Sequence, residues 1–301
     1  MTQYTKNTLT EAENSAWKIV YDLVEPNQKI LDIGCSSGNL GQELISKKTC
    51  RVHGVDISKE DVDIAKKKLH KAWVFDVETD VIEKIKDRYD AVLLIDVIEH
   101  LNDPIKALQK IRNFMKKDGK IVFSIPNMAH TSIRLELLKG KFNYTETGLL
   151  DYTHLHFYTG DFIKKVFQMA GFSIDSINCT SVTYPESLLT LELKKVGLRS
   201  TKAFKDFLHE SKGDAYQYIG VASLSGDRGG PSKVGLPKRN PHEYSFDEID
   251  KTIKKLKKDM SLKENHIQNL EAHISHLEGE LDKPKGFKKV TNKLSRKDNE
   301  K

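Results

Sequence analysis

The chain has 301 residues, of which 38% are hydrophobic and 31% charged, as expected for one or two soluble domains. No run approaches about 18 consecutive apolar residues, which excludes a transmembrane helix, and residues 1–6 lack the apolar core of a signal peptide. Cys35, Cys50 and Cys179 are widely spaced and form no C-x-x-C pair, which is typical of free thiols in a reducing compartment. We therefore expect a cytoplasmic protein.

The charge is concentrated at one end. Lysine and arginine number 49 and aspartate and glutamate 43, so the net charge is +6. Residues 283–301 carry eight basic and two acidic residues, so this tail accounts for all of the net charge. Residues 1–282 are therefore neutral overall, and they contain no stretch in which basic residues alternate with aromatic ones. This composition does not favour nucleic acid as a partner.

Residues 29–41 (KILDIGCSSGNLG) contain the most informative pattern in the chain. An apolar strand over 30–33 leads into a loop with Gly34 and Gly38, and a helix follows over 39–48. Glycines at such a junction let a ligand approach the backbone, and the helix start offers free N–H groups. The spacing differs from both the dinucleotide fingerprint and the phosphate-binding P-loop. Asp32, before the first glycine, suits an ammonium group better than a pyrophosphate.

Apolar runs and helical patterns alternate along the first half of the chain. Strands are predicted over 30–33, 51–56, 73–76, 90–96 and 120–125, and helices over 39–48, 59–70, 78–87 and 104–117. A helix over 160–170 and strands over 172–178 and 216–224 follow, the last strand forming a hairpin with its neighbour. This order predicts a doubly wound, mostly parallel sheet with ligands at the carboxyl ends of its strands. Four acids fall at those ends: Asp32, Asp56, Asp76 and Asp96.

Asp32-x-Gly34-x-Ser36-x-Gly38 resembles motif I of the class I S-adenosylmethionine (SAM) methyltransferases, with Ser36 in place of the usual middle glycine. The resemblance implies a Rossmann-like seven-stranded α/β fold and SAM as the cofactor. Asp56, at the second strand end, is placed to bind the ribose hydroxyls, and the resemblance assigns Asp76 to the adenine. The predicted cofactor-binding residues are Asp32, Gly34, Cys35, Ser36, Gly38, Asp56, Ile57, Asp76, Val77 and Asp96.

Three segments carry residues suited to acid–base chemistry: 96–101, 126–130 and 148–157. The sulfonium already activates the methyl group, so a hydroxyl acceptor needs alignment and a base, and histidine is suited to that role near neutral pH. The candidate bases are His154, His130 and His100. In an extended segment, His154 and His156 share one face. Alternatively, this segment only covers the SAM cleft, and a histidine there satisfies a backbone group.

Residues 125–159 resemble methyltransferase domains found with glycosyltransferases in surface-polysaccharide biosynthesis, and the Glu99-His100 pair resembles ubiquinone-pathway O-methyltransferases. The expected reaction is methyl transfer to a hydroxyl of a glycan or glycan precursor. Tyr152 and His156 replace arginines usual in the polysaccharide-type domains, which indicates a less anionic acceptor. A small-molecule O- or N-methyltransferase is the alternative.

Two further alternatives stay open. Asp96, Glu99 and His100, together with His130 or His154, have ligand types that could hold Mg²⁺ or Zn²⁺, as in the RNA 3′-end methyltransferases. The neutral body argues against RNA, and we assign no metal site from the sequence. The other alternative is a non-catalytic SAM-fold scaffold.

The composition changes after residue 225. We predict a methyltransferase domain over 1–225, a flexible linker over 226–245, a coiled coil over 246–282 and a basic tail over 283–301. Isoleucine at a and leucine at d favour a parallel dimer over a trimer, with Lys263 as the polar core position. The tail suits either an anionic membrane surface, at the inner face of the membrane, or a solvated end.

Overall fold

The computed structural model describes residues 15–81, 85–225, 258 and 263. The chain divides into two units, Met1–Tyr244 and Ser245–Lys301. In the second unit, the two described residues, Lys258 and Lys263, are helical and exposed. The predicted linker, the basic tail and all other positions of the predicted coiled coil lie outside the described residues.

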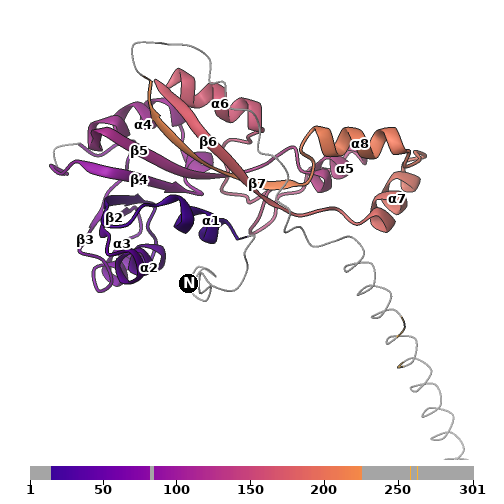
Figure 1. Cartoon of the computed structure of the whole chain (residues 1–301). Coiled ribbons are helices and arrows are strands. Elements are labelled where there is room, and N and C mark those ends of the chain that lie inside the picture. Colours follow the sequence, from indigo (N-terminus) through magenta and orange to yellow (C-terminus); the bar gives the residue numbers. More distant parts are fainter. Residues whose placement is uncertain (1–14, 82–84, 226–257, 259–262, 264–301) are drawn as a thin grey trace, which may run out of the picture. The chain divides into compact units, whose positions relative to one another are not determined.

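The first unit is built on one seven-stranded sheet in the order β3-β2-β1-β4-β5-β7-β6 (Figure 1). The five strands from β3 to β5 run parallel, and β7 pairs antiparallel with both β5 and β6. This arrangement confirms the predicted mostly parallel seven-stranded sheet. The strands are β1 (Lys29–Ile33), β2 (Arg51–Asp56), β3 (Lys71–Val74), β4 (Tyr89–Ile95), β5 (Met115–Pro126), β6 (Phe172–Ser181) and β7 (Ala215–Leu224).

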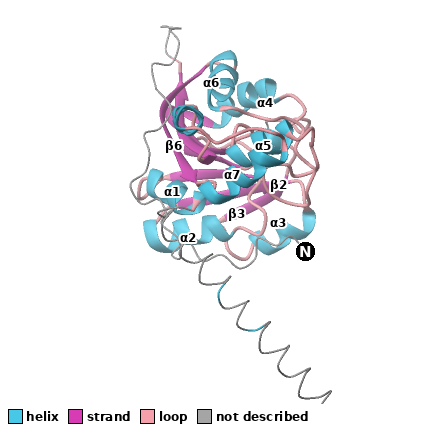
Figure 2. Ribbon diagram, turned by 90° about the vertical axis from the view of Figure 1, so that its right-hand side faces the viewer, coloured by secondary structure: helices cyan, strands magenta, loops and turns pink. Residues whose placement is uncertain are grey.

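Helices cover both faces of the sheet, as Figures 1 and 2 show. One face packs against α1 (Ala16–Leu23), α2 (Asn39–Lys48) and α3 (Lys59–Ala65). The other packs against α4 (Pro104–Ile111) and α6 (Gly160–Met169). Successive strand residues therefore enter opposite cores, which is why the central strands are apolar at nearly every position.

Three further helices form a small apolar cluster of their own and lie together beyond the end of β7 (Figure 1). They are α5 (Thr131–Leu138), α7 (Glu186–Lys195) and α8 (Lys202–Glu210). None of these three helices was predicted from the sequence. Among the helices that the structure describes, none is both long and apolar enough to cross a membrane.

Two predicted helices are shorter than expected. The helix predicted over 59–70 ends at Ala65, after which the chain turns, and the backbone N–H of His70 donates to Val52 at the edge of β2. The helix predicted over 104–117 ends at Ile111 and continues as the short 3₁₀ helix η4 (Arg112–Phe114). Met115 already pairs with Tyr89 in the sheet, so strand pairing overrides the helical pattern there.

The prediction of a helix over 78–87 was wrong for the described part of that range, because neither 78–81 nor 85–87 is helical. Residues 77–79 form a turn instead. Asp76 accepts hydrogen bonds from the backbone N–H of Glu78 (2.8 Å) and the hydroxyl of Thr79 (2.8 Å). The backbone N–H of Asp76 donates to Asp80. Such local bonds from aspartate side chains compete with helical hydrogen bonding.

Candidate functional site

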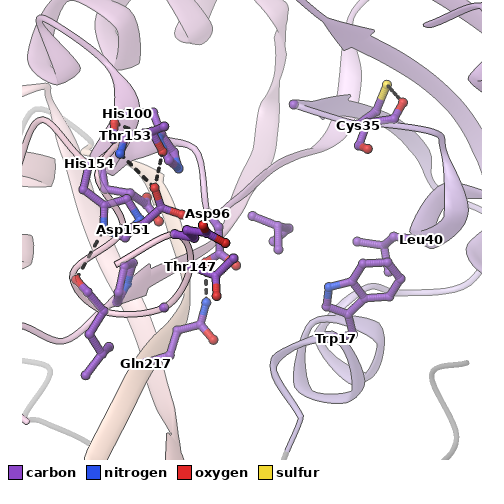
Figure 3. Close-up of a pocket in the computed structure, with 18 of the residues that line it drawn as sticks. Trp17, Cys35, Leu40, Asp96, His100, Thr147, Asp151, Thr153, His154 and Gln217 are labelled. Carbon is purple, nitrogen blue, oxygen red and sulfur yellow. Dashed lines mark hydrogen bonds between the residues drawn. The ribbon is translucent and has the colours of Figure 1, made fainter. Parts of the chain in front are cut away.

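A cavity of about 770 Å³ lies at the carboxyl ends of β1 and β4. Figure 3 shows Trp17, Cys35 and Leu40 on one side of the cavity. His100, His154, Asp96 and Gln217 lie on the other side. The described lining residues are Trp17, Asp32, Gly34, Cys35, Ser36, Ser37, Asn39, Leu40, Ile95, Asp96, Glu99, His100, Pro126, Glu146, Thr147, Gly148, Leu149, Asp151, Tyr152, Thr153, His154, Tyr216 and Gln217. Two of the four predicted strand-end acids, Asp32 and Asp96, therefore line one cavity together with part of the histidine segment, residues 148–157.

The glycine loop after β1 has the left-handed turns that its sequence requires. Gly34 has φ +73°, and a Cβ there would meet Val97 at 2.6 Å, so only glycine fits. Gly38 (φ +76°) caps α2 without a side-chain hydrogen bond. Ser36 adopts φ 45°, a conformation usual for glycine, at the position where motif I has its middle glycine. The loop thus has a left-handed residue at Ser36 as well as at the two glycines.

Asp32 is a buried carboxyl at the tip of β1 and lines the cavity with 3% of its surface exposed. Burial, and secondarily the charge of Asp56, raises the pKa of Asp32 from 3.8 to about 7. A cation placed beside it would favour the ionised form and offset the unfavourable burial of charge. This is the electrostatic property expected of an ammonium-binding acid.

Asp56 holds the glycine loop from the end of β2. Its two carboxylate oxygens accept hydrogen bonds from the backbone N–H groups of Ser36 (2.8 Å) and Ser58 (2.9 Å). Its neighbour Ile57 is 75% exposed. Five of the predicted cofactor-binding residues are absent from the described lining of the cavity. They are Gly38, Asp56, Ile57, Asp76 and Val77.

Asp96, just after β4, combines a backbone φ of 55° with a carboxylate held by two donors. The hydroxyl of Ser124 donates to Oδ1 at 2.7 Å, and the side-chain amide of Gln217 donates to the same oxygen. Burial raises the pKa of this carboxyl, while both hydrogen bonds act in the opposite direction. A residue other than glycine in a left-handed conformation is often found at functional sites.

The histidine segment is docked on the short 3₁₀ helix η3 (Ile98–His100). The backbone carbonyl of Glu99 accepts hydrogen bonds from the N–H groups of Leu155 (2.9 Å) and His156 (3.1 Å). Asp151 fixes the preceding turn, because its Oδ1 accepts from both the N–H and the hydroxyl of Thr153. This anchoring places the rings of His100 and His154 edge to face, with centroids 4.9 Å apart.

Each of these rings contacts a backbone carbonyl through Nδ1. His100 Nδ1 lies 3.1 Å from the carbonyl oxygen of Thr153, and His154 Nδ1 lies 3.3 Å from that of Leu149. A carbonyl oxygen can only accept, so Nδ1 carries the proton and Nε2 keeps a lone pair in the neutral ring. Burial, with His100 as a second cause, lowers the pKa of His154, which favours its neutral form.

The other two histidines named from the sequence lie elsewhere. His130 caps α5, and its ring bonds to the hydroxyl of Ser132 (2.8 Å) and the carbonyl of Val182 (2.7 Å). His156 bonds to the carbonyl of Asn102 (3.2 Å). Neither residue is among the described residues that line the cavity, so the expected common face of His154 and His156 is not directed into it.

The lining residues that had no signal in the sequence include Trp17, Glu146 and Gln217. Trp17 comes from α1, and Gln217 lies opposite Pro126 in the β5–β7 ladder. Because such placements depend on packing and strand pairing, a local motif cannot indicate them.

The residues present fit SAM on two observations. Asp32 is a buried acid suited to an amino group, and it lines the same cavity as Gly34, where the loop makes its left-handed turn. Buried Cys35 packs against Gly54, where a Cβ would meet its sulfur at 2.6 Å. Burial raises the pKa of the Cys35 thiol, so it fills space and is a poor nucleophile.

The sequence profile of a family described as "Methyltransferase domain" matches residues 12–177, more than half of the chain. The chain therefore belongs to the methyltransferase domain family, of the class I, SAM-dependent type, and its cofactor is SAM.

Individual relatives are more distant. The chain is 26% identical over 124 residues to a ubiquinone biosynthesis O-methyltransferase of Actinobacillus pleuropneumoniae, which covers 38% of this chain and 53% of the relative. It is 30% identical over 124 residues to a probable (S)-tetrahydroprotoberberine N-methyltransferase 2 of Papaver bracteatum, covering 39% and 35%. The chain thus spans about half the length, or less, of these curated relatives. A SAM-dependent methyltransferase structure from Archaeoglobus fulgidus is 19% identical, with 69% of this chain and 94% of that chain covered and a TM-score of 0.48.

Proposed function

We propose that this chain transfers the methyl group of SAM to a hydroxyl group of a glycan or glycan precursor. The observation that carries the proposal is that His100 and His154 line the same cavity as the glycine loop around Asp32. The sulfonium of SAM makes the methyl group electrophilic, so the protein has to align the acceptor oxygen and provide for loss of its proton. The Nε2 lone pairs of the two histidines are suited to that task, and His154 is the favoured base.

The lining favours an acceptor without phosphate or carboxylate groups near the reacting hydroxyl. It contains five acidic side chains and, among the described residues, no lysine or arginine. This composition supports the expectation from Tyr152 and His156 that the acceptor is less anionic than that of the polysaccharide-type domains. It also disfavours an RNA 3′ end, whose phosphates need cationic partners.

Aromatic side chains near the cavity support a sugar as the acceptor. Phe142, Tyr144 and Phe157 contact one another with ring centroids 5.5–6.2 Å apart. Phe142 is 38% and Tyr144 54% exposed. Phe157 packs against the cluster of Ile133, Leu149 and Leu150, and the last two of these residues belong to the loop that borders the cavity through Leu149. Partly exposed aromatic faces can stack on the apolar face of a sugar ring while its hydroxyls reach polar groups.

The second candidate is a small-molecule hydroxyl. It is favoured by the relatives named for ubiquinone biosynthesis, whose similarity covers about 38% of this chain. A catechol and a sugar both present neighbouring hydroxyls, so the same histidine wall could serve either acceptor.

An acceptor panel tests the proposal. The full chain is incubated with SAM and maltotriose, UDP-glucose or 3,4-dihydroxybenzoate, and S-adenosylhomocysteine and methylated product are measured by mass spectrometry. Methylation of a sugar in preference to the catechol is expected, with loss of product in His154→Ala. Methylation of the catechol alone would replace the glycan proposal by the second candidate.

A further inference from the structure

Three side chains in the cavity wall present ligand atoms to a common point. One carboxylate oxygen of Glu99 and one ring nitrogen each of His100 and His154 lie within 4.8 Å of one another. The helix η3 supplies Glu99 and His100, and the segment docked on the backbone carbonyl of Glu99 supplies His154. Figure 3 shows the two histidines side by side next to the cavity.

Glu99 is the unexplained member of this group. Its side chain is fully buried, and neither Oε1 nor Oε2 has a hydrogen-bond partner. Burying a carboxyl without a partner is unfavourable by several kcal/mol when it is charged and by about 1–3 kcal/mol when it is neutral. A cation bound at this point would supply the missing partner to the carboxylate.

The orientation of both histidines also fits a ligand role. Nδ1 of each ring donates to a backbone carbonyl, of Thr153 for His100 and of Leu149 for His154. Histidines that bind metals commonly donate their other ring N–H in this way, which fixes the tautomer and aims the lone pair. Since each Nδ1 is bonded to a carbonyl, Nε2 is the ring nitrogen of each histidine that is free to bind a metal ion.

We propose that Glu99, His100 and His154 form a binding site for a divalent transition-metal ion of the Zn²⁺ type. Two imidazoles and one carboxylate are a donor set that suits Zn²⁺ better than Mg²⁺, which prefers oxygen ligands. Three protein ligands leave a fourth position open toward the cavity.

The distances allow such a site after a small adjustment. If the three ligand atoms stood 4.8 Å apart, an ion at their centre would lie about 2.8 Å from each. Zinc binds nitrogen and oxygen ligands at about 2.0–2.2 Å, so each atom has to move inward by at most about 0.8 Å.

The consequence for catalysis rests on the proposed function. An acceptor hydroxyl bound to the ion in the open position becomes more acidic, and its proton leaves to solvent water. The oxygen then forms a bond to the methyl carbon while the carbon–sulfur bond of SAM breaks, and the electron pair remains on sulfur, which becomes a neutral thioether. In the loaded protein, the histidines act on the hydroxyl through the ion.

Calorimetric titration of ZnCl₂ into the full chain, after treatment with EDTA and its removal, tests the site. Wild type is expected to bind one equivalent of Zn²⁺. Glu99→Gln and His100→Gln are each expected to lower the affinity for Zn²⁺ by more than about 100-fold, which exceeds the loss typical of removing a residue that only supports a metal ligand. His209→Gln is the matched control, because His209 also lies near a carboxylate, 3.5 Å from Asp214, but on α8. MgCl₂ is expected to bind more weakly than ZnCl₂.

SAM binding, measured on the same samples, separates this inference from the proposed function. Zinc binding unchanged in both site variants, with far-ultraviolet circular dichroism showing that they fold, would overturn the metal site even if SAM still binds. Loss of zinc from His209→Gln alone would overturn it as well. Retained zinc binding in wild type without any methyl transfer would contradict the proposed function but uphold the site. Full methyl transfer in the EDTA-treated protein would refute the catalytic role of the ion.

Discussion

Asp32→Asn is expected to stabilise the ligand-free protein above pH 7 and to weaken SAM binding. Burial raises the pKa of this carboxyl from 3.8 to about 7, so the folded protein holds a proton there that the unfolded chain loses near pH 4. Stability of the wild type therefore falls as the pH rises from about 4 to about 7 and then stays low. Asparagine cannot ionise, so the variant is spared this loss.

The size of the effect follows from the pKa. A change from 3.8 to about 7 corresponds to at most about 4 kcal/mol at pH 8 and to about 1–2 kcal/mol at pH 5. SAM binding should fall by roughly 10- to 150-fold, because a charge-assisted contact to the amino group of about 1.5–3 kcal/mol is lost.

Urea unfolding at pH 5 and pH 8 measures the first effect, and calorimetric titration of SAM at pH 8 the second. Asp56→Asn is the matched control, because it makes the same substitution at the neighbouring acid. Unlike Asp32→Asn, it removes a carboxylate oxygen that accepts a hydrogen bond from the backbone N–H of Ser36 or Ser58. That variant should lose stability at both pH values. If Asp32→Asn gains no stability at pH 8 relative to pH 5, or binds SAM as wild type does, the assignment of Asp32 as the buried, cation-binding acid is refuted.

Three further predictions concern catalysis, assembly and the tail. His154→Ala should keep SAM affinity near wild type and lower turnover by about 100-fold or more in an S-adenosylhomocysteine assay. His130→Ala should instead lower the free energy of unfolding by about 1–2 kcal/mol with turnover retained. A loss of turnover below tenfold in His154→Ala would contradict its role as the base. Aspartate at both Ile267 and Ile274 should convert a dimeric full chain to monomers in sedimentation equilibrium, because buried like charges oppose the a positions, and a persistent dimer would contradict the coiled-coil interface. Vesicles with anionic lipid should retain the full chain at low salt and release it at high salt if residues 283–301 bind membranes, and a chain ending at Asp282 should not be retained.

The sequence was sufficient to predict the sheet and the glycine loop after β1. Continuous apolar runs reveal strands buried on both faces, and Asp103 before Pro104 correctly predicts where α4 begins. The motif I loop is recognisable because only glycine tolerates the turn at Gly34 beside Val97. These features are local, so their spacing along the chain carries the information.

The remaining features depend on contacts between distant segments. Helices α5, α7 and α8 bury only a small cluster of leucines: Leu135, Leu189, Leu193 and Leu208. The apolar pattern of each helix is therefore too weak to predict the helix from the sequence. The pairing of His100 with His154 depends on the N–H groups of Leu155 and His156 binding the carbonyl of Glu99. No spacing rule could separate His154 from His130, because what distinguishes them is the surroundings of each ring.

The central claim is that SAM occupies the cavity between the glycine loop and the histidine segment, and tryptophan fluorescence tests it most directly. The chain has two tryptophans. Trp17 lines the cavity, and Trp73 on β3 contacts His53 instead. Titration with SAM should change the emission of wild type and of Trp73→Phe, and leave that of Trp17→Phe unchanged while calorimetry still detects binding. A change that follows Trp73, or calorimetric binding without any change in wild type, would place SAM outside this cavity and contradict the account.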